Sequence, residues 1–242
     1  MASMKTRIIT SVIAIPLVVL ILLIGANYFW VVTLLVSAVT ALMTTEILTA
    51  KNILKKCSIS VPCILFAFAL PLVAHTKFIV LIIFAFIVAI FLSLMLNYAK
   101  FSFDDLSFAF TGTFLISSGM ACLNYLIVTF QFFTAFILTL ILAVPWMSDA
   151  GAYFAGTFFG KHKLCPNISP KKTVEGFFGG VLFCIITSIL VGVIFQNLIY
   201  TNMKINYISL LIIGILDSII SVIGDLSFSL IKRHCQIKDY GS

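Results

Sequence analysis

The sequence predicts an all-α protein, a helical bundle embedded in a membrane. Of its 242 residues, 62% are hydrophobic and only 10% are charged, whereas soluble domains are typically about 25% charged. Apolar runs long enough to cross a bilayer, about 20 residues each, recur from one end of the chain to the other. No hydrophilic segment is large enough to form a separate domain, so we expect one membrane domain over residues 1–242.

The apolar runs indicate eight spans. They lie near residues 8–24, 28–49, 59–74, 78–96, 106–128, 132–150, 177–197 and 207–231. The first run is interpreted as a membrane helix and not as a removable signal peptide, because no cleavage site separates it from the next span. Residues 1–131 form an N-terminal transmembrane part, and residues 132–242 form a C-terminal part that carries most of the unusual polar residues and is expected to be catalytic.

The basic residues orient these spans. With the N-terminus in the cytoplasm, only Lys77 and Lys204 of the 15 Lys and Arg residues fall on the outer side, as the positive-inside rule requires. Both termini are therefore expected in the cytoplasm. The net charge of +7 is explained by anionic lipid headgroups of the bilayer, and the sequence gives no reason to expect nucleic acid as a partner.

Polar residues gather between Trp146 and Gly180, in the segment WMSDAGAYFAGTFFGKHKLCPNISPKKTVEGFFGG. Asp149 is placed at the cytoplasmic end of the sixth span, and positions 149, 153, 156 and 160 share one helical face. We interpret the glycines on this face as sites of close helix packing. Packing does not explain Asp149, which is a candidate functional acid.

A short polar segment directly precedes the seventh span. It consists of Ser169, Pro170, Lys171, Lys172, Thr173, Val174 and Glu175. The Ser-Pro pair predicts a helix start, with the serine as N-cap and the proline in the first helical position. The N–H groups of that helix end, with two lysines beside them, would form a site for phosphate oxygens. A basic membrane anchor is the simpler alternative, but it gives the threonine and the glutamate no role.

The last span contains two acids, Asp217 and Asp225, each of which would cost roughly 2.5–3.5 kcal/mol near the bilayer centre. Polar residues spaced by three or four positions form one stripe toward the cytoplasmic end. The stripe consists of Ser218, Ser221, Asp225, Ser229 and Lys232. We expect it to face the protein interior. Contacts between helices would explain its first two serines, but Asp225 less well.

Carboxylates, lysines and hydroxyls at a cytoplasmic membrane edge suit a magnesium-dependent reaction of a phosphorylated lipid. Oxygen ligands hold Mg²⁺, the ion bridges substrate phosphates, and lysines neutralise the remaining charge. The residues alone lead to this class of chemistry and no further.

The run SDAGAYFAGTFFGKHKLCPNISPKKTVEG, together with MKTRIITSVIAIPL from Met4, resembles the phosphatidate cytidylyltransferases, or CDP-diacylglycerol synthases. The opening of that family's C-terminal signature is matched at the same spacing by Ser229, Lys232, Arg233, Lys238, Asp239 and Gly241. The resemblance implies transfer of the cytidylyl group from CTP to phosphatidate, with Mg²⁺, in phospholipid biosynthesis. It also implies a bacterial inner membrane, with the active site on the cytoplasmic side.

Roles for individual residues follow from the resemblance and from the residue chemistry. Catalysis is assigned to Asp149, Lys171, Lys172, Asp225 and Lys232. Substrate binding is assigned to Ser169, Thr173, Glu175, Ser229, Arg233 and Lys238, and metal binding to Asp225 and Asp239. The sequence leaves open whether the chain forms a homodimer.

The chain departs from the family at its end. The family signature continues with a His-Gly-Gly segment and an Asp-Arg-x-Asp ending, whereas this chain stops at Ser242. The expectation is that residues 1–242 alone have little or no activity, which measurable CTP-dependent lipid synthesis by this chain would overturn.

Two other functions remain open from the sequence. A polytopic transporter or lipid carrier would use Asp217 and Asp225 along an ion path. A CTP-dependent lipid or prenol kinase would transfer the terminal phosphate of CTP and leave CDP, whereas a cytidylyltransferase leaves pyrophosphate.

Overall fold

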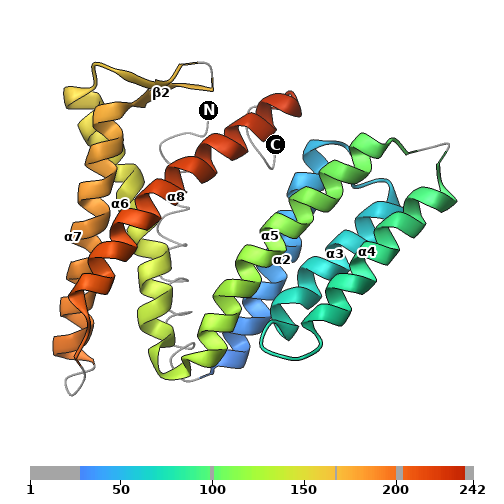
Figure 1. Ribbon diagram of the computed structural model, residues 1–242, viewed down its shortest axis with the longest axis horizontal. Helices are drawn as coiled ribbons and strands as arrows, with labels where there is room; N and C mark the ends of the chain where they lie inside the picture. The colour runs from blue at the N-terminus through green and yellow to red at the C-terminus, as the bar shows by residue number, and fades with distance from the viewer. Residues whose placement is uncertain (1–27, 99–100, 167, 200–203, 238–242) are drawn as a thin grey trace, which may run out of the picture. The chain divides into compact units, whose positions relative to one another are not determined.

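The computed structural model describes residues 28–98, 101–166, 168–199 and 204–237, and it confirms the all-α membrane class (Figure 1). Within these ranges, six helices are long and apolar enough to cross a membrane. The expected third span is a helix of 17 residues, shorter than the other six. The expected first span, 8–24, lies outside the described residues. Six spans, not eight, therefore meet both conditions in the described part of the chain.

The elements follow one another in a simple order. They are α2 (Phe29–Ala50), α3 (Cys57–Val73), α4 (Ile79–Leu96), α5 (Phe103–Thr129), a 3₁₀ turn η1 (Gln131–Phe133), α6 (Thr134–Phe159), β1 (Lys163–Cys165), β2 (Ser169–Thr173), α7 (Val174–Leu198) and α8 (Tyr207–His234). Most bounds lie close to the expected ones. Helix α6 is the exception, because it runs to Phe159 and does not end near residue 150. Asp149 consequently lies well inside α6 and not at its end.

The chain divides into two compact units, one of residues 1–135 with 239–242, and one of residues 136–238. The first unit contains α2 to α5. The second contains α6 from Phe136 onward, the hairpin β1–β2, α7 and α8. The division into parts 1–131 and 132–242 stays a prediction, since it concerned function and not compactness.

Helices α2, α3 and α5 pack together in the first unit, and α2 presents buried hydroxyl groups to its neighbours. Ser37, Thr40 and Thr44 each donate a hydrogen bond to a carbonyl one turn earlier, over 2.6 to 3.0 Å. Their polar groups are therefore satisfied within the helix. Small side chains of this kind let membrane helices approach closely.

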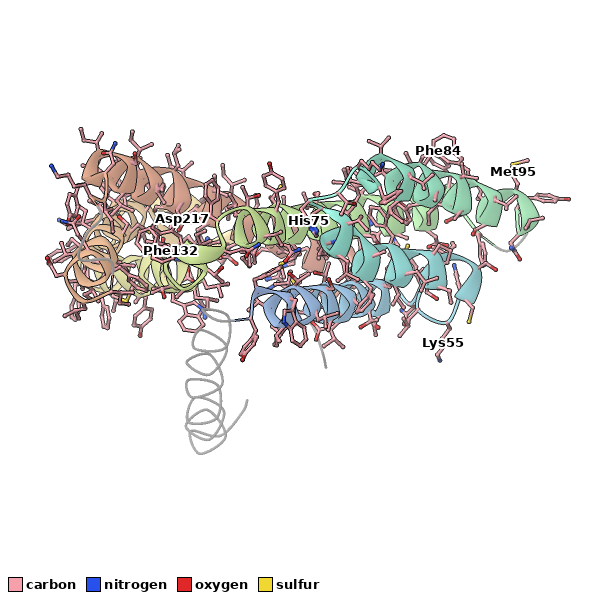
Figure 2. The ribbon with its side chains drawn as sticks, turned by 90° about the horizontal axis from the view of Figure 1, so that it is seen from below. Lys55, His75, Phe84, Met95, Phe132 and Asp217 are labelled. Carbon is pink, nitrogen blue, oxygen red and sulfur yellow. The ribbon has the colours of Figure 1, made fainter. Side chains whose placement is uncertain are left out.

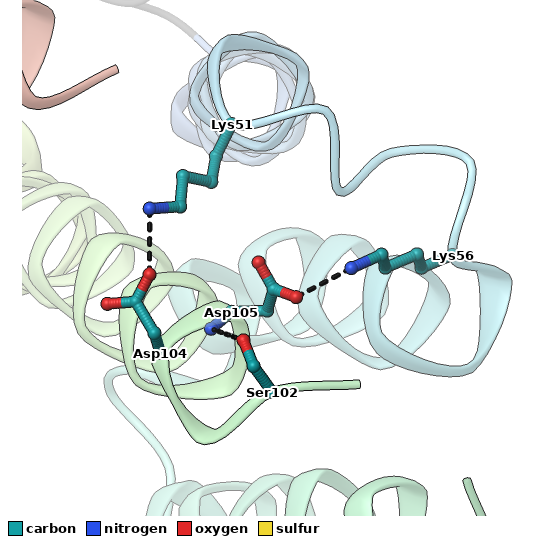
Figure 3. A network of polar contacts seen from close by, with 5 residues as sticks. All are labelled: Lys51, Lys56, Ser102, Asp104 and Asp105. Atoms are coloured by element: carbon teal, nitrogen blue, oxygen red, sulfur yellow. Dashed lines mark hydrogen bonds and ion pairs between the residues drawn. The ribbon is translucent and has the colours of Figure 1, made fainter. Parts of the chain in front are cut away.

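Two ion pairs join the loop after α2 to the start of α5 (Figure 3). Lys51 Nζ lies 2.8 Å from Asp104 Oδ2, and Lys56 Nζ lies 2.6 Å from Asp105 Oδ2. Ser102 caps α5, because its hydroxyl accepts a hydrogen bond from the Asp105 N–H. Acids in the first turn of a helix also interact favourably with its dipole. This network fixes one end of the first unit.

Helix α4 is the most apolar helix of the first unit, and much of its surface is exposed. Phe84 and Met95 are 63% and 73% exposed, and Figure 2 shows both side chains pointing away from the neighbouring helices. A face of large apolar side chains suits contact with lipid tails.

Glycines let α6 and α7 approach closely in the second unit, and Gly156 confirms the packing interpretation, since a Cβ there would lie 2.9 Å from Thr173 Oγ1 and 3.7 Å from Gly176 Cα. A Cβ added at Gly151 would lie 2.8 Å from the Gly179 carbonyl oxygen and 2.7 Å from Phe183 Cβ. A Cβ at Gly176 would lie 2.8 Å from the Ala152 carbonyl oxygen. Real Cβ atoms do not come this near to backbone oxygens, so side chains at these positions would force the helices apart.

The helix predicted to start at Ser169 starts at Val174 instead. Residues Ser169–Thr173 form strand β2, which pairs antiparallel with β1 through Lys163 opposite Thr173. Thr173 is the N-cap of α7, since its Oγ1 accepts a hydrogen bond from the Gly176 N–H over 3.1 Å. Two hydroxyl residues compete for the cap, and pairing with β1 keeps the first of them extended. The two lysines therefore lie on a strand and not in the first turn of a helix.

Candidate active site

A cavity of about 370 Å³ lies in the second unit, lined by residues of α6, the hairpin, α7 and α8. Four residues singled out in the sequence line it: Asp149, Lys171, Lys172 and Thr173. Figure 1 shows the hairpin and the C-terminal half of α8 at the same end of this unit. The fold thus brings together two segments that are about 50 residues apart in the chain, as their numbering shows.

Lys172 forms an ion pair with Asp225 of α8, with 2.7 Å between Nζ and Oδ2. The charges of Asp225 and Lys172 both act on the Asp149 carboxyl group. Two acids and one lysine from three different elements therefore form one electrostatic group. The sequence predicted all three residues, but not that the lysine would pair with Asp225.

The ion pair is too exposed to be explained by stability. The side chains of Lys172 and Asp225 are 24% and 54% exposed. Exposed pairs contribute at most about 1 kcal/mol, because water screens the charges and ordering a lysine costs entropy. Fixed charges at the edge of a cavity are instead what a phosphate-binding site needs.

Thr173 joins the hairpin to both α6 and α7. Its Oγ1 caps α7, and the same atom would lie 2.9 Å from a Cβ added at Gly156. The absence of a side chain at Gly156 thus makes room for the threonine. Because Lys172 directly precedes Thr173, this packing fixes the base of the strand that carries the lysine.

Ser169 and Glu175 do not line the cavity. Ser169 begins β2, opposite Cys165. The Glu175 carboxylate instead accepts hydrogen bonds from the backbone N–H of His162, at 3.2 and 3.3 Å. His162 was assigned no role from the sequence. Substrate binding by Ser169 and Glu175 stays a prediction.

The remaining predicted residues lie further along α8 or beyond it. Ser229, Lys232 and Arg233 are in the last two turns of α8 and do not line the cavity. Lys238 and Asp239 lie outside the described residues. Their assigned roles stay predictions.

The polar stripe of α8 is only partly buried, so the expectation that it faces the interior is wrong for Asp225. Ser218 is fully buried, whereas more than half of the Asp225 side chain is exposed. The two differ because Ser218 packs within the unit, while Asp225 lies at the unit's surface, where it pairs with Lys172. Asp217 does not line the cavity.

Other lining residues were not predicted as part of a site. They are Ser148, Ala152, Tyr153, Gly156, Thr157, Leu164, Gly176, Phe177 and Val222. Four of them could have been found from the sequence, because positions 148, 152, 153 and 156 surround Asp149 on one side of a helix. Val222 could not, since its place depends on how α8 packs.

The described residues contain no group of three or more His, Cys, Asp or Glu side chains placed to hold a metal ion. Magnesium does not require such a group, because it is commonly held by one or two carboxylates together with substrate phosphates and water. Asp149 provides one carboxylate in the cavity lining, and Asp225, which interacts with it electrostatically, provides a second one through its ion pair with the lining residue Lys172. The donor set therefore fits Mg²⁺ that arrives with a phosphorylated substrate.

Comparisons of this sequence with known proteins identify similarity to cytidylyltransferases. The cytidylyltransferase family matches residues 5–242. A phosphatidate cytidylyltransferase of Staphylococcus haemolyticus is 34% identical over 248 residues, which cover 98% of this chain and 88% of the relative. The phosphatidate cytidylyltransferase of Bacillus subtilis is 32% identical and covers all of this chain and 89% of the relative. The one from Staphylococcus aureus (strain COL) is 34% identical, with 98% and 88% covered.

Proposed function

We propose that this chain, which belongs to the cytidylyltransferase family, transfers the cytidylyl group of CTP to phosphatidate. The products are CDP-diacylglycerol, an intermediate of phospholipid biosynthesis, and pyrophosphate. The observation that supports this most directly is the cavity lined by Asp149 and Lys172, together with the ion pair that joins Lys172 to Asp225 of α8. Its lysines suit phosphates and its carboxylates suit a divalent cation.

The reaction requires little covalent chemistry from the protein. A phosphate oxygen of phosphatidate attacks the α-phosphorus of CTP, and the bond from that phosphorus to the oxygen bridging to the β-phosphate breaks. Both substrates carry negative charge, so their approach must be made favourable by fixed positive charge and orientation. Lys171 and Lys172 provide this charge from β2, at the wall of the cavity.

Asp149 and Asp225 are proposed to hold Mg²⁺ together with the phosphates of CTP. When bound, the ion would neutralise charge on the triphosphate and assist the departure of pyrophosphate. Lys172 pairs with Asp225, so it keeps one acid oriented toward the cavity. Asp239, Ser229, Lys232 and Arg233 remain proposed parts of the same site.

The membrane location follows from the helices, and we propose that the membrane is a bacterial inner membrane with the cavity on the cytoplasmic side. All the relatives named above are bacterial. The hairpin beside the cavity carries Lys163, Lys171 and Lys172, and the positive-inside rule places such loops in the cytoplasm. CTP is made in the same compartment.

Labelled CTP separates this function from its alternatives. Membranes that carry the chain are incubated with phosphatidate, Mg²⁺ and CTP labelled at either the α- or the γ-phosphate. Label from the α position in lipid indicates cytidylyl transfer, whereas label from the γ position indicates a kinase. No lipid label from either position, both with this chain and with one continued by the ending of the family signature, would contradict both enzyme functions and favour the transporter.

Two matched variants separate the enzyme from the transporter, and a second, longer chain tests the family ending. Asp225→Asn, which removes the partner of the cavity residue Lys172, should abolish the α-label in lipid, while Asp217→Asn, which leaves that ion pair in place, should retain it. A transporter that uses both acids would instead lose solute flux in both variants. The assay includes a chain continued by the His-Gly-Gly and Asp-Arg-x-Asp ending of the family signature, so that a requirement for this ending is measured separately.

A further inference from the structure

The first turn of α7 holds the open end of the β1–β2 hairpin through His162. Glu175 accepts hydrogen bonds from the His162 N–H, and its Oε1 lies 2.6 Å from His162 Nδ1. In the opposite direction, the Val174 N–H donates to the His162 carbonyl oxygen over 2.9 Å. Both backbone groups and the imidazole of His162 are thus bound by two consecutive residues, Val174 and Glu175. We call this set of contacts the clasp.

The clasp lies at the point where the two strands of the hairpin meet α7. Strand β1 begins at Lys163, directly after His162, and Lys163 is opposite Thr173, the last residue of β2. Lys172 and Lys171 precede Thr173 and line the cavity. Any movement of His162 away from α7 would therefore displace the strand pair that carries both lysines.

Glu175 itself does not reach the cavity. Its side chain is 24% exposed and that of His162 is 77% exposed, so the contact is open to solvent on one side. Such a pair contributes little to the free energy of unfolding. The Glu175 carboxylate is better explained by the geometry that it imposes on the hairpin.

We infer that Glu175 is a positioning residue for cytidylyl transfer, because it holds His162 and thereby places Lys171 and Lys172 against the phosphates of CTP. The inference rests on the proposed function. It assigns Glu175 an indirect role, in place of the direct substrate contact predicted from the sequence. It also gives His162 a role that its sequence neighbourhood did not indicate.

Steady-state kinetics of four variants test this role. Glu175→Ala removes every contact of the carboxylate and should raise KM for CTP and lower kcat/KM by about tenfold or more, since small displacements of positioning groups are costly. Glu175→Gln keeps one acceptor oxygen and should restore part of the loss. His162→Ala keeps the backbone N–H and should have a smaller effect than Glu175→Ala. Lys161→Ala, an exposed neighbour of the clasp, should leave KM unchanged and so control for local charge.

The double variant His162→Ala with Glu175→Ala should be no worse than Glu175→Ala alone, because both changes act on one contact. Fully additive losses would contradict the clasp. A fall in kcat with KM for CTP unchanged in Glu175→Ala would also overturn the inference, because loss of folded enzyme lowers kcat alone.

Hydrogen exchange of residues 161–174 provides a readout that does not depend on activity. The N–H groups of His162 and Val174 should exchange faster in Glu175→Ala and at the normal rate in Lys161→Ala. Unchanged exchange in Glu175→Ala would refute the clasp even if the wild type is active. Faster exchange in a protein that labels no lipid either as given or when continued by the family ending would show that the clasp exists and that the proposed function has failed, which removes the positioning role with it.

Discussion

Replacing Gly151 by alanine should destabilise the second unit, because α6 and α7 touch at this position. The added Cβ would lie 2.8 Å from the Gly179 carbonyl oxygen and 2.6 and 2.7 Å from Phe183 Cγ and Cβ. Carbon–oxygen contacts are normally no shorter than about 3.3 Å. The oxygen belongs to the backbone, and the Phe183 atoms are at the root of the side chain. The clash cannot be relieved by a rotamer change, so the helices must separate by several tenths of an ångström.

The cost can be estimated from known overpacking variants. Forcing extra methyl groups into packed interiors typically costs about 1–3 kcal/mol, which for a chain of this size corresponds to a fall in Tm of about 2–12 °C. Gly224→Ala is the matched control on α8 of the same unit, because a Cβ there would meet nothing within 4 Å. Alanine is the better helix former, so the control should be neutral or more stable by up to about 1 kcal/mol.

Cys184 reports the unfolding of this unit directly. The thiol is fully buried on α7 and packs against Val144 of α6, so its modification by a thiol reagent requires the two helices to open. Detergent-solubilised variants are heated with the reagent, and the labelled fraction of Cys184 is measured by mass spectrometry. Equal midpoints for Gly151→Ala and Gly224→Ala would refute the close approach of α6 and α7.

Three further changes test the cavity and the hairpin. Lys172→Met should alter the free energy of unfolding by less than about 1 kcal/mol, because its pair with Asp225 is exposed, while kcat/KM for CTP in the lipid-labelling assay should fall about a hundredfold. Asp149→Asn should raise the Mg²⁺ concentration needed for half-maximal labelling, because one of the two carboxylates is lost, while KM for phosphatidate stays near that of the wild type. Thr173→Val removes the oxygen that caps α7 and should lower the free energy of unfolding by about 1 kcal/mol, measured by the same Cys184 labelling.

The helices could be predicted because a bilayer imposes a length on each apolar run. The bounds of α2, α4 and α7 match the apolar runs within a few residues. Asp149 and the lysine pair could be found because acids and bases are costly in such a chain and need an explanation. These inferences use local composition only; the helices are confirmed, and the roles of Asp149 and the lysines stay predictions.

The hairpin could not be predicted, because it depends on contacts between segments. Ser169 and Thr173 are both good caps, and only pairing with residues 163–165 selects Thr173. The shared face of positions 149, 153 and 156 predicted that the helix continues past Asp149, although its glycines each cost about 1 kcal/mol relative to alanine in a helix. They continue the helix because close contact with α7 offsets that cost.

The close approach of α6 and α7 also explains why the functional groups can meet. Asp149 lies on α6 in the same stretch as the packed glycines, and Thr173 fits against Gly156. A side chain at Gly156 would push Thr173 outward, and Lys172 would move with it, away from Asp225. The glycine contacts are thus a condition for the charge arrangement as well as for packing. A variant at Gly156 should therefore lower kcat/KM for CTP more than a variant elsewhere in α6 that lowers the free energy of unfolding by the same amount.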